Sequence, residues 1–140
     1  MSEVEIRRVG SAGASLFERV AEEVFDEPVD PDRLAAYLAD PGHILLVALV
    51  DGEVVAQVAA VLHRHPDKPT ELYIDEVGVT PARQRQGIAR RMMNEMFAIG
   101  RTLGCAEAWV ATEIDNIPAR SLYESRGSSG DYFVMYLYQL

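Results

Sequence analysis

The sequence predicts an α/β (α+β) fold in which one central sheet is covered by helices. Apolar runs typical of strands are interspersed with segments of helical periodicity, in the order βααββ, then βαβα, then β. The chain of 140 residues is 49% apolar, which is enough for one hydrophobic core. No repeat, linker or low-complexity stretch interrupts the sequence, so residues 1–140 are expected to form a single domain.

The first elements are expected to be one strand and two helices. Val4–Val9 has the composition of a short strand, and Ala14–Phe25 carries apolar residues at helical spacing. Asp30 followed by Pro31 is typical of an N-cap and a first helical residue, so a second helix should run from there to about Leu38.

A hairpin and a third long strand follow. The apolar runs Ile44–Val50 and Glu53–Leu62 are separated by Asp51 and Gly52, a pair that favours a type I′ turn because both residues tolerate positive φ angles. After a polar, proline-containing loop, Glu71–Val79 alternates polar and apolar residues and is expected to form a strand.

The last part of the chain is predicted to hold the longest helix. Apolar residues recur at helical spacing through Gly87–Leu103, and Gly104 is placed to end that helix. Glu107–Ala111 is expected to form a strand, Ile117–Arg126 a short helix, and the aromatic-rich segment Tyr132–Leu140 a final strand.

The net charge of −9 argues against a nucleic-acid partner, because phosphates require a basic surface. It is compatible with a small cationic substrate, which an acidic protein attracts electrostatically. An acidic surface also serves solubility alone, so the charge does not choose between these interpretations.

A few residues bear on the cellular compartment of the protein and on whether it binds a metal. Cys105 is the single cysteine, so no internal disulfide can form, and a cytoplasmic location is expected. The first five residues are acidic rather than basic, and no apolar run approaches the ~18 residues of a membrane span. His43, His63 and His65 show no ligand-like spacing, so no metal site is expected.

The segment Val77–Ala89 carries the clearest chemical signal. A strand leads into a basic loop and then into a helix, whose first N–H groups and positive dipole end can bind phosphate. Gly87 allows a close approach of the ligand. The positive charges here are Arg83, Arg85, Arg90 and Arg91. Neither the Walker pattern nor the dinucleotide fingerprint is present, and an ordinary turn with solvated arginines is the alternative.

Two motifs in this order resemble the GNAT superfamily of acetyl-CoA-dependent N-acetyltransferases. Gln84–Ala89 is similar to its Gln/Arg-x-x-Gly-x-Gly/Ala loop, and Val77–Pro81 is similar to its bulged strand and turn. Asp115–Gly127 resembles its Asn-x-x-Ala-x-x-x-Tyr motif followed by glycine. The resemblance implies a mixed, mostly antiparallel sheet with helices on both faces and with two central strands splayed apart at the cofactor site.

The resemblance also implies residue roles in binding acetyl-CoA. Backbone N–H groups from Arg85 to Ala89 would hold the pyrophosphate, Val77 and Val79 would pair with the pantetheine arm, and Asn116 would contact the arm from the other side. The implied cofactor-binding residues are Val77, Val79, Gln84, Arg85, Gln86, Gly87, Ile88, Ala89, Arg90 and Asn116. The family's apolar residue after the last glycine is replaced by Ser128, which leaves the shape of the acceptor pocket open.

An amine attacks a thioester as the free base, so a proton must leave it first, and a carboxylate can accept that proton directly or through water. Glu71, Asp75 and Glu76 are the candidates on one strand. Strand periodicity places Asp75 on the face of Tyr73 and Val77, and Glu76 on the face of Ile74 and Gly78. Glu76 is the favoured base because it should lie just before the bulge. Glu71 and Asp75 are assigned to substrate binding, and solvated strand carboxylates are the alternative for each of the three.

The departing thiolate needs a proton, and Tyr123 is implied to point its hydroxyl at the thioester sulfur and to donate one. Core packing is the alternative role for this tyrosine. The Val79 N–H could stabilise the oxyanion of the tetrahedral intermediate. Cys105 has no sequence context typical of a nucleophile, so direct transfer without an acetyl-enzyme is expected.

Among GNAT enzymes, the closest resemblance is to the aminoglycoside 3-N-acetyltransferases, through Glu71–Val79 and Arg85–Ala89. This likeness implies acetylation of an aminoglycoside antibiotic and a role in resistance. Another amine (a polyamine, an amino acid or a protein N-terminus) and a non-catalytic acetyl-CoA sensor are the alternatives. The sequence leaves a homodimer open.

Overall fold

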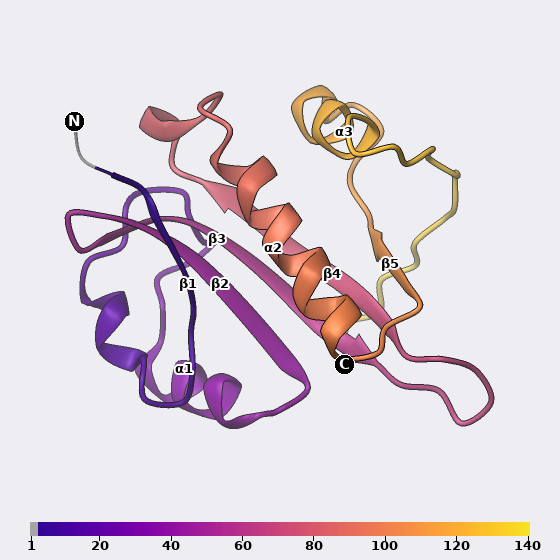
Figure 1. The fold of residues 1–140 in the computed structure, drawn as a ribbon, viewed down its shortest axis with the longest axis horizontal. Coiled ribbons are helices and arrows are strands. Elements are labelled where there is room, and N and C mark those ends of the chain that lie inside the picture. The colour runs from indigo at the N-terminus through magenta and orange to yellow at the C-terminus, as the bar shows by residue number, and fades with distance from the viewer. Residues whose placement is uncertain (1–2) are drawn as a thin grey trace.

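The computed structural model describes residues 3–140 and contains one five-stranded sheet with the strand order β1-β2-β3-β4-β5 (Figure 1). Neighbouring strands from β1 to β4 are antiparallel, whereas β4 and β5 are parallel. The predicted mixed, mostly antiparallel sheet is therefore confirmed. The strands are β1 (Glu5–Arg8), β2 (His43–Val50), β3 (Glu53–His63), β4 (Glu71–Val79) and β5 (Glu107–Val110).

Helices cover both faces of this sheet. The long helix α2 lies across one face and buries Met92, Met93 and Met96 against β2, β3 and β4 (Figure 1). On the other face, η1 and α1 pack over a second apolar cluster built from β2 and β3. The helices are η1 (Ala14–Glu18, 3₁₀), α1 (Pro31–Ala39), η2 (Pro81–Arg83, 3₁₀), α2 (Ile88–Thr102) and α3 (Ile117–Glu124). Within residues 3–140, no helix has the length and apolar character required to cross a bilayer.

Local signals in the sequence correctly placed several element boundaries. Asp30 caps α1 by accepting hydrogen bonds from the backbone N–H groups of Asp32 and Arg33, both at 2.9 Å. Asp51 and Gly52 have φ angles of 50° and 79°, as a type I′ turn requires. These residues set the register in which β2 pairs with β3.

The predicted helix over Ala14–Phe25 is wrong beyond its first turn. A 3₁₀ helix ends at Glu18, and the chain then runs beside β3, where Val20 bridges Val54. The Ala21 N–H donates to the Val54 carbonyl at 2.9 Å. Backbone N–H and C=O groups that would form hydrogen bonds within a longer helix are instead hydrogen-bonded to β3.

The predicted final strand over Tyr132–Leu140 is also not formed. No strand pairing involves this segment within the part of the chain that the structure describes, and its large apolar side chains are exposed. A high β-propensity reflects how well side chains pack on a sheet. Propensity alone therefore does not pair this segment with the sheet, although the outer edge of β5 is open.

The sheet opens between its two parallel strands. β4 pairs with β5 over Glu71–Ile74 and Glu107–Val110, whereas the rest of β4 continues beside β3 alone. The predicted splay of two central strands is present, and it leaves one edge of β4 unpaired from residue 75 onward.

Candidate active site

A cleft of about 780 Å³, the main cleft, occupies the gap where β4 and β5 part. This volume is within the range of about 300–1,000 Å³ typical of small-molecule sites. The predicted site residues that line it are Asp75, Glu76, Val77, Val79, Gln84, Arg85, Gly87, Ile88, Ala89, Arg90, Asn116 and Tyr123. Two predicted residues, Glu71 and Gln86, are not among its lining residues.

The open edge of β4 presents backbone hydrogen-bonding groups to the main cleft. The Thr80 N–H donates to the Val55 carbonyl on β3 at 2.9 Å. Residues of an antiparallel strand alternate between facing the partner and facing away, so the N–H and C=O groups of Val77 and Val79 are turned away from β3. Because β5 pairs no further than Ile74, a ligand can take the place of a neighbouring strand.

The start of α2 lies at the end of this edge. Gly87 is the N-cap, has a φ of 79°, and provides no side-chain cap. The first helical bond runs from the Arg91 N–H to the Gly87 carbonyl, so the N–H groups of Ile88, Ala89 and Arg90 have no intrahelical acceptor. Such a helix start attracts anions.

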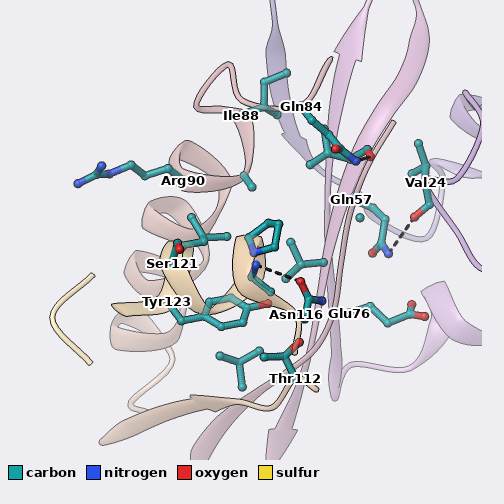
Figure 2. Close-up of a pocket in the computed structure, with 18 of the residues that line it drawn as sticks. Val24, Gln57, Glu76, Gln84, Ile88, Arg90, Thr112, Asn116, Ser121 and Tyr123 are labelled. Atoms are coloured by element: carbon teal, nitrogen blue, oxygen red, sulfur yellow. Dashed lines mark hydrogen bonds between the residues drawn. The ribbon is translucent and has the colours of Figure 1, made fainter. Parts of the chain in front are cut away.

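The loop that precedes α2 is held in shape by two glutamine side chains. The Gln84 Nε2 donates to the Val79 carbonyl at 3.1 Å (Figure 2), and the Gln86 Nε2 donates to the Ala82 carbonyl at 3.3 Å. Arg85 occupies a left-handed conformation with a φ of 62°. Both glutamine side chains thus support the loop, and the exposed arginines supply its positive charge.

A β-bulge sits at Asp75. Glu76 pairs with Ala59, and Ile74 pairs with Ala60, so Asp75 is an extra residue between two consecutive pairs. The bulge was expected after Glu76, but the structure places it immediately before. A bulge of this kind bends the strand and locally re-aims its side chains.

The bulge reverses the predicted side-chain alternation. Ile74 and Val77 both pack toward the cluster under α2, whereas Glu76 lines a pocket on the opposite face. Gly78 shares that opposite face, because a Cβ added there would collide with the Val24 carbonyl. The assignment of Glu76 to the face of Ile74 is therefore wrong, since strict alternation fails at a bulge.

The second pocket, the acidic pocket, has a volume of about 410 Å³ and lies between β4 and the segment that leads into α1. Glu76 lines both this pocket and the main cleft. Asp26, Glu27 and Asp30 also line it, and the buried Tyr37 hydroxyl finds no hydrogen-bond partner among residues 3–140. The sequence interpretation missed these residues, although the acidic run after Phe25 was visible in the sequence.

Partial desolvation and neighbouring charges favour the protonated forms of the Asp75 and Glu76 carboxyls, although both residues are exposed at the rim of the main cleft. The pKa of Glu76 is raised by burial and then by the negative charges of Asp75 and Asp26. Burial also raises the pKa of Asp75. A carboxylate with a raised pKa is a stronger base than an ordinary one, so Glu76 is suited to accept a proton at the junction of the two cavities.

Tyr123 and Asn116 reach the main cleft from α3. The Asn116 Oδ1 accepts a hydrogen bond from the Ala119 N–H at 3.2 Å and so caps this helix. Figure 2 shows the Tyr123 hydroxyl directed toward Asn116, with the Glu76 side chain pointing away from both. Burial raises the pKa of Tyr123, which keeps its hydroxyl protonated and able to donate.

Glu71 and Cys105 lie away from this chemistry. The Glu71 Oε2 is 3.1 Å from the Nε2 of His65, and the pKa of Glu71 is lowered by this hydrogen bond. The structure thus places Glu71 outside both cavities, although the sequence analysis assigned it to substrate binding. Cys105 is likewise not among the lining residues, and burial raises its pKa.

Gln57 is a site residue that the sequence interpretation missed. It is 2% exposed, lines the main cleft, and donates from Nε2 to the Val24 carbonyl at 3.3 Å (Figure 2). Its Oε1 has no hydrogen-bond partner among the described residues. The sequence offered one signal, because Gln57 is the single amide in the apolar run of β3. A buried polar side chain normally has a hydrogen-bond partner, so such a residue points to a specific contact.

Comparisons with known proteins agree with this architecture. The acetyltransferase (GNAT) family description matches residues 12–127. An uncharacterized N-acetyltransferase of Mycobacterium bovis is 29% identical over 73% of the chain, and the chain spans 63% of the length of that relative. The N-alpha-acetyltransferase RimI of Mycobacterium tuberculosis is 28% identical over 91% of the chain and 74% of its own length.

Solved structures share the fold at low sequence identity. An aminoglycoside acetyltransferase from an uncultured soil metagenomic sample, in complex with sisomicin, superposes with a TM-score of 0.81 at 19% identity, covering 98% of this chain and 96% of that one. The aminoglycoside N-acetyltransferase AAC(6')-Iy in complex with CoA has a TM-score of 0.80 at 16% identity, covering 99% and 96%.

Proposed function

Because the chain belongs to the acetyltransferase (GNAT) family, we propose that it is an acetyl-CoA-dependent N-acetyltransferase whose cofactor lies in the main cleft. The observation that carries this proposal is the continuity of two backbone features. The edge of β4 at Val77 and Val79 pairs with no strand, although Gln84 bonds the Val79 carbonyl, and it is followed by η2 and the loop that ends at the uncapped N-terminus of α2. An extended amide-containing arm fits the first feature, and a pyrophosphate fits the second.

Acetyl-CoA supplies an acetyl group activated as a thioester, and the residues of this chain manage the protons. As the new C–N bond forms and the C–S bond breaks, Glu76 accepts a proton from the amine, directly or through water. Tyr123 donates a proton to the departing sulfur. The Val79 N–H, on the open edge of β4, is the proposed donor to the oxyanion.

We propose that the acceptor is a small cationic amine bound in the acidic pocket, and specifically an aminoglycoside acetylated at the 3-amino group. The carboxyl groups of Asp26, Glu27 and Asp30 outnumber the one cation, Arg33, among the residues that line this pocket, and this balance favours a cationic substrate. The orphan hydroxyl of Tyr37 offers a hydrogen bond to a sugar hydroxyl or amine. The similarity to RimI favours a protein N-terminus as the second candidate.

Thiol release from acetyl-CoA tests both levels of the proposal. The panel should hold aminoglycosides with and without a 3-amino group, polyamines, amino acids and peptides with free N-termini. Turnover that requires the 3-amino group is expected. Turnover with peptides alone would transfer the assignment to the second candidate, and acetyl-CoA binding without turnover on the panel would favour a sensor.

We also propose that the protein is a homodimer. The segment Tyr132–Leu140 leaves its large apolar side chains exposed along its whole length, and contiguous exposed apolar surface marks interaction sites. A second copy offers the same segment and the open outer edge of β5, so the contact can be reciprocal. Light scattering should show a dimer that Phe133→Asp and Leu137→Asp together convert to a monomer, whereas a wild-type monomer would refute the proposal.

A further inference from the structure

A cluster of two histidines and one glutamate lies at the far end of β4 from the acidic pocket. The Glu71 Oε2 is 3.1 Å from the Nε2 of His65 and 3.7 Å from the Nδ1 of His63. One ligand atom from each of the three side chains lies within 4.8 Å of the other two. The two imidazole rings have centroids 4.2 Å apart and are tilted by 47° to each other.

These separations match the spacing of ligands around a tetrahedral ion. Zinc binds imidazole nitrogen and carboxylate oxygen at about 2.0–2.2 Å, so neighbouring ligand atoms in a tetrahedron lie about 3.3 Å apart. The two distances from the Glu71 Oε2 bracket that value. A metal ion could therefore enter with small side-chain adjustments.

The backbone holds two of the three ligands in register. His63 ends β3, Glu71 begins β4, and the two residues are direct partners in the antiparallel ladder. His65 comes from the connection between these strands. Because the spacing arises from strand pairing across the turn, it could not be recognised as a ligand pattern along the sequence.

The side chains are accessible enough for an ion to enter. The His65 and Glu71 side chains are 14% and 24% exposed, whereas the His63 side chain is 52% exposed. Three protein ligands leave a fourth tetrahedral position for water. Two nitrogen ligands and one oxygen ligand favour zinc and similar transition metals over magnesium and calcium, which require oxygen ligands.

We propose that His63, His65 and Glu71 form a binding site for one divalent transition-metal ion, with zinc as the preferred ion, that fastens the β3–β4 connection. The three ligands are not among the residues that line the main cleft or the acidic pocket. The ion therefore acts on the structure of this connection and takes no part in the acetyl transfer proposed above.

The test is calorimetric titration of zinc chloride into protein that carries no histidine tag, together with the visible absorption of bound cobalt. One ion per chain and the absorption bands of tetrahedral cobalt are expected. His65→Gln and Glu71→Gln should each weaken zinc binding by about a hundredfold or more, because even outer partners of a ligand contribute about 10–100-fold.

His43→Gln is the matched control, because this third histidine lies near Asp40 with its Nε2 3.7 Å from the Oδ2 and is outside the cluster. It should bind zinc like the wild type. The proposal is overturned if the wild type binds no zinc, or if His43→Gln weakens binding as much as His65→Gln does. Thiol release should be the same in His65→Gln as in the wild type. A failure to bind zinc can therefore be distinguished from a failure of the acetyltransferase assignment.

Discussion

The side chain of Gln57 on β3 donates a hydrogen bond to the backbone carbonyl of Val24, 33 residues away in the sequence, at 3.3 Å. This bond fixes a segment whose residues line both the main cleft and the acidic pocket. A Cβ at Gly78 would collide with the same carbonyl. The segment around Val24 can therefore pack against β4, because Gln57 holds the Val24 carbonyl and Gly78 has no side chain to collide with it.

Gln57→Leu is expected to lower the free energy of unfolding by about 1–3 kcal/mol, because the buried Val24 carbonyl loses its partner. Urea unfolding monitored by circular dichroism measures the change. Gln86→Leu is the matched control, since the Gln86 amide also bonds a backbone carbonyl but is exposed, and its effect should be within about 0.5 kcal/mol. Equal effects in both variants would contradict the structural role of Gln57.

Gly87→Asp is expected to abolish acetyl-CoA binding, because it places a negative charge at the helix start that we propose as the phosphate site. At a hundredfold excess over its dissociation constant, acetyl-CoA should stabilise the wild type by about 2.7 kcal/mol and leave the variant unchanged. Thermal unfolding with and without acetyl-CoA measures this difference.

The control for this prediction is Gly104→Asp. Gly104 has a φ of 84°, close to the 79° of Gly87, and an added Cβ meets no atom within 4 Å at either position. The two variants thus share backbone strain and charge but lie at opposite ends of α2. Loss of binding in both would show that strain, and not the phosphate site, is responsible.

Tyr123→Phe is expected to reduce turnover by about 10²–10⁴-fold, the usual contribution of a general acid, while leaving acetyl-CoA affinity almost unchanged. The ring packs in both proteins, whereas the hydroxyl acts as the thiolate departs. Steady-state thiol release and calorimetry separate the two effects. Tyr73→Phe, whose ring stacks on Trp109, should behave like the wild type, and equal activity in both variants would leave Tyr123 a packing residue.

Sequence reasoning succeeded where the signal was local. The Asp30 cap, the Asp51–Gly52 turn and the glycine before α2 each determine a boundary through the conformation of one or two residues. The helix start at Gly87, the proposed phosphate site, was predictable as a structural element for the same reason, because a helix start offers N–H groups whatever packs around it. These features account for the order of the central elements and for the position of the main cleft.

The features that were missed depend on pairing between distant segments. The bulge at Asp75 follows from how β4 aligns with β3, and no residue type in β4 marks it. The contact between His65 and Glu71 likewise arises when the two strands meet. The helix expected after Glu18 ends early because β3 offers the backbone better partners, which periodicity alone cannot indicate.

Glu76→Gln is expected to stabilise the folded protein at neutral pH. The pKa of Glu76 is raised above its ordinary 4.5, so the stability that this group contributes is present below about pH 4.5 and is lost as the pH rises through the folded-state pKa. A glutamine amide does not ionise, so the variant does not lose stability as the pH rises through this range. Urea midpoints should be higher for the variant at pH 7 and equal near pH 4. Glu95→Gln, which changes a glutamate of α2 that lines neither cavity, should match the wild type at both.

The same substitution should also change how activity depends on pH. If Glu76 is the base, the wild-type rate falls as the pH drops below the raised pKa of this carboxyl, because a protonated carboxyl accepts no proton. Glu76→Gln should lose that acidic limb together with most of its turnover. A carboxylate that merely held the cationic amine would instead raise KM and leave kcat nearly intact.

Profiles of kcat against pH for Glu76→Gln, Asp75→Asn and Glu71→Gln decide which carboxylate acts. Glu76 lines both cavities, Asp75 lines the main cleft, and Glu71 lines neither, so the effect should decrease in that order. An acidic limb that keeps its full height in Glu76→Gln would exclude this residue as the base. Its disappearance in Asp75→Asn would mean that the bulge turns Asp75 toward the amine, and its persistence in all three variants would leave solvent as the proton acceptor.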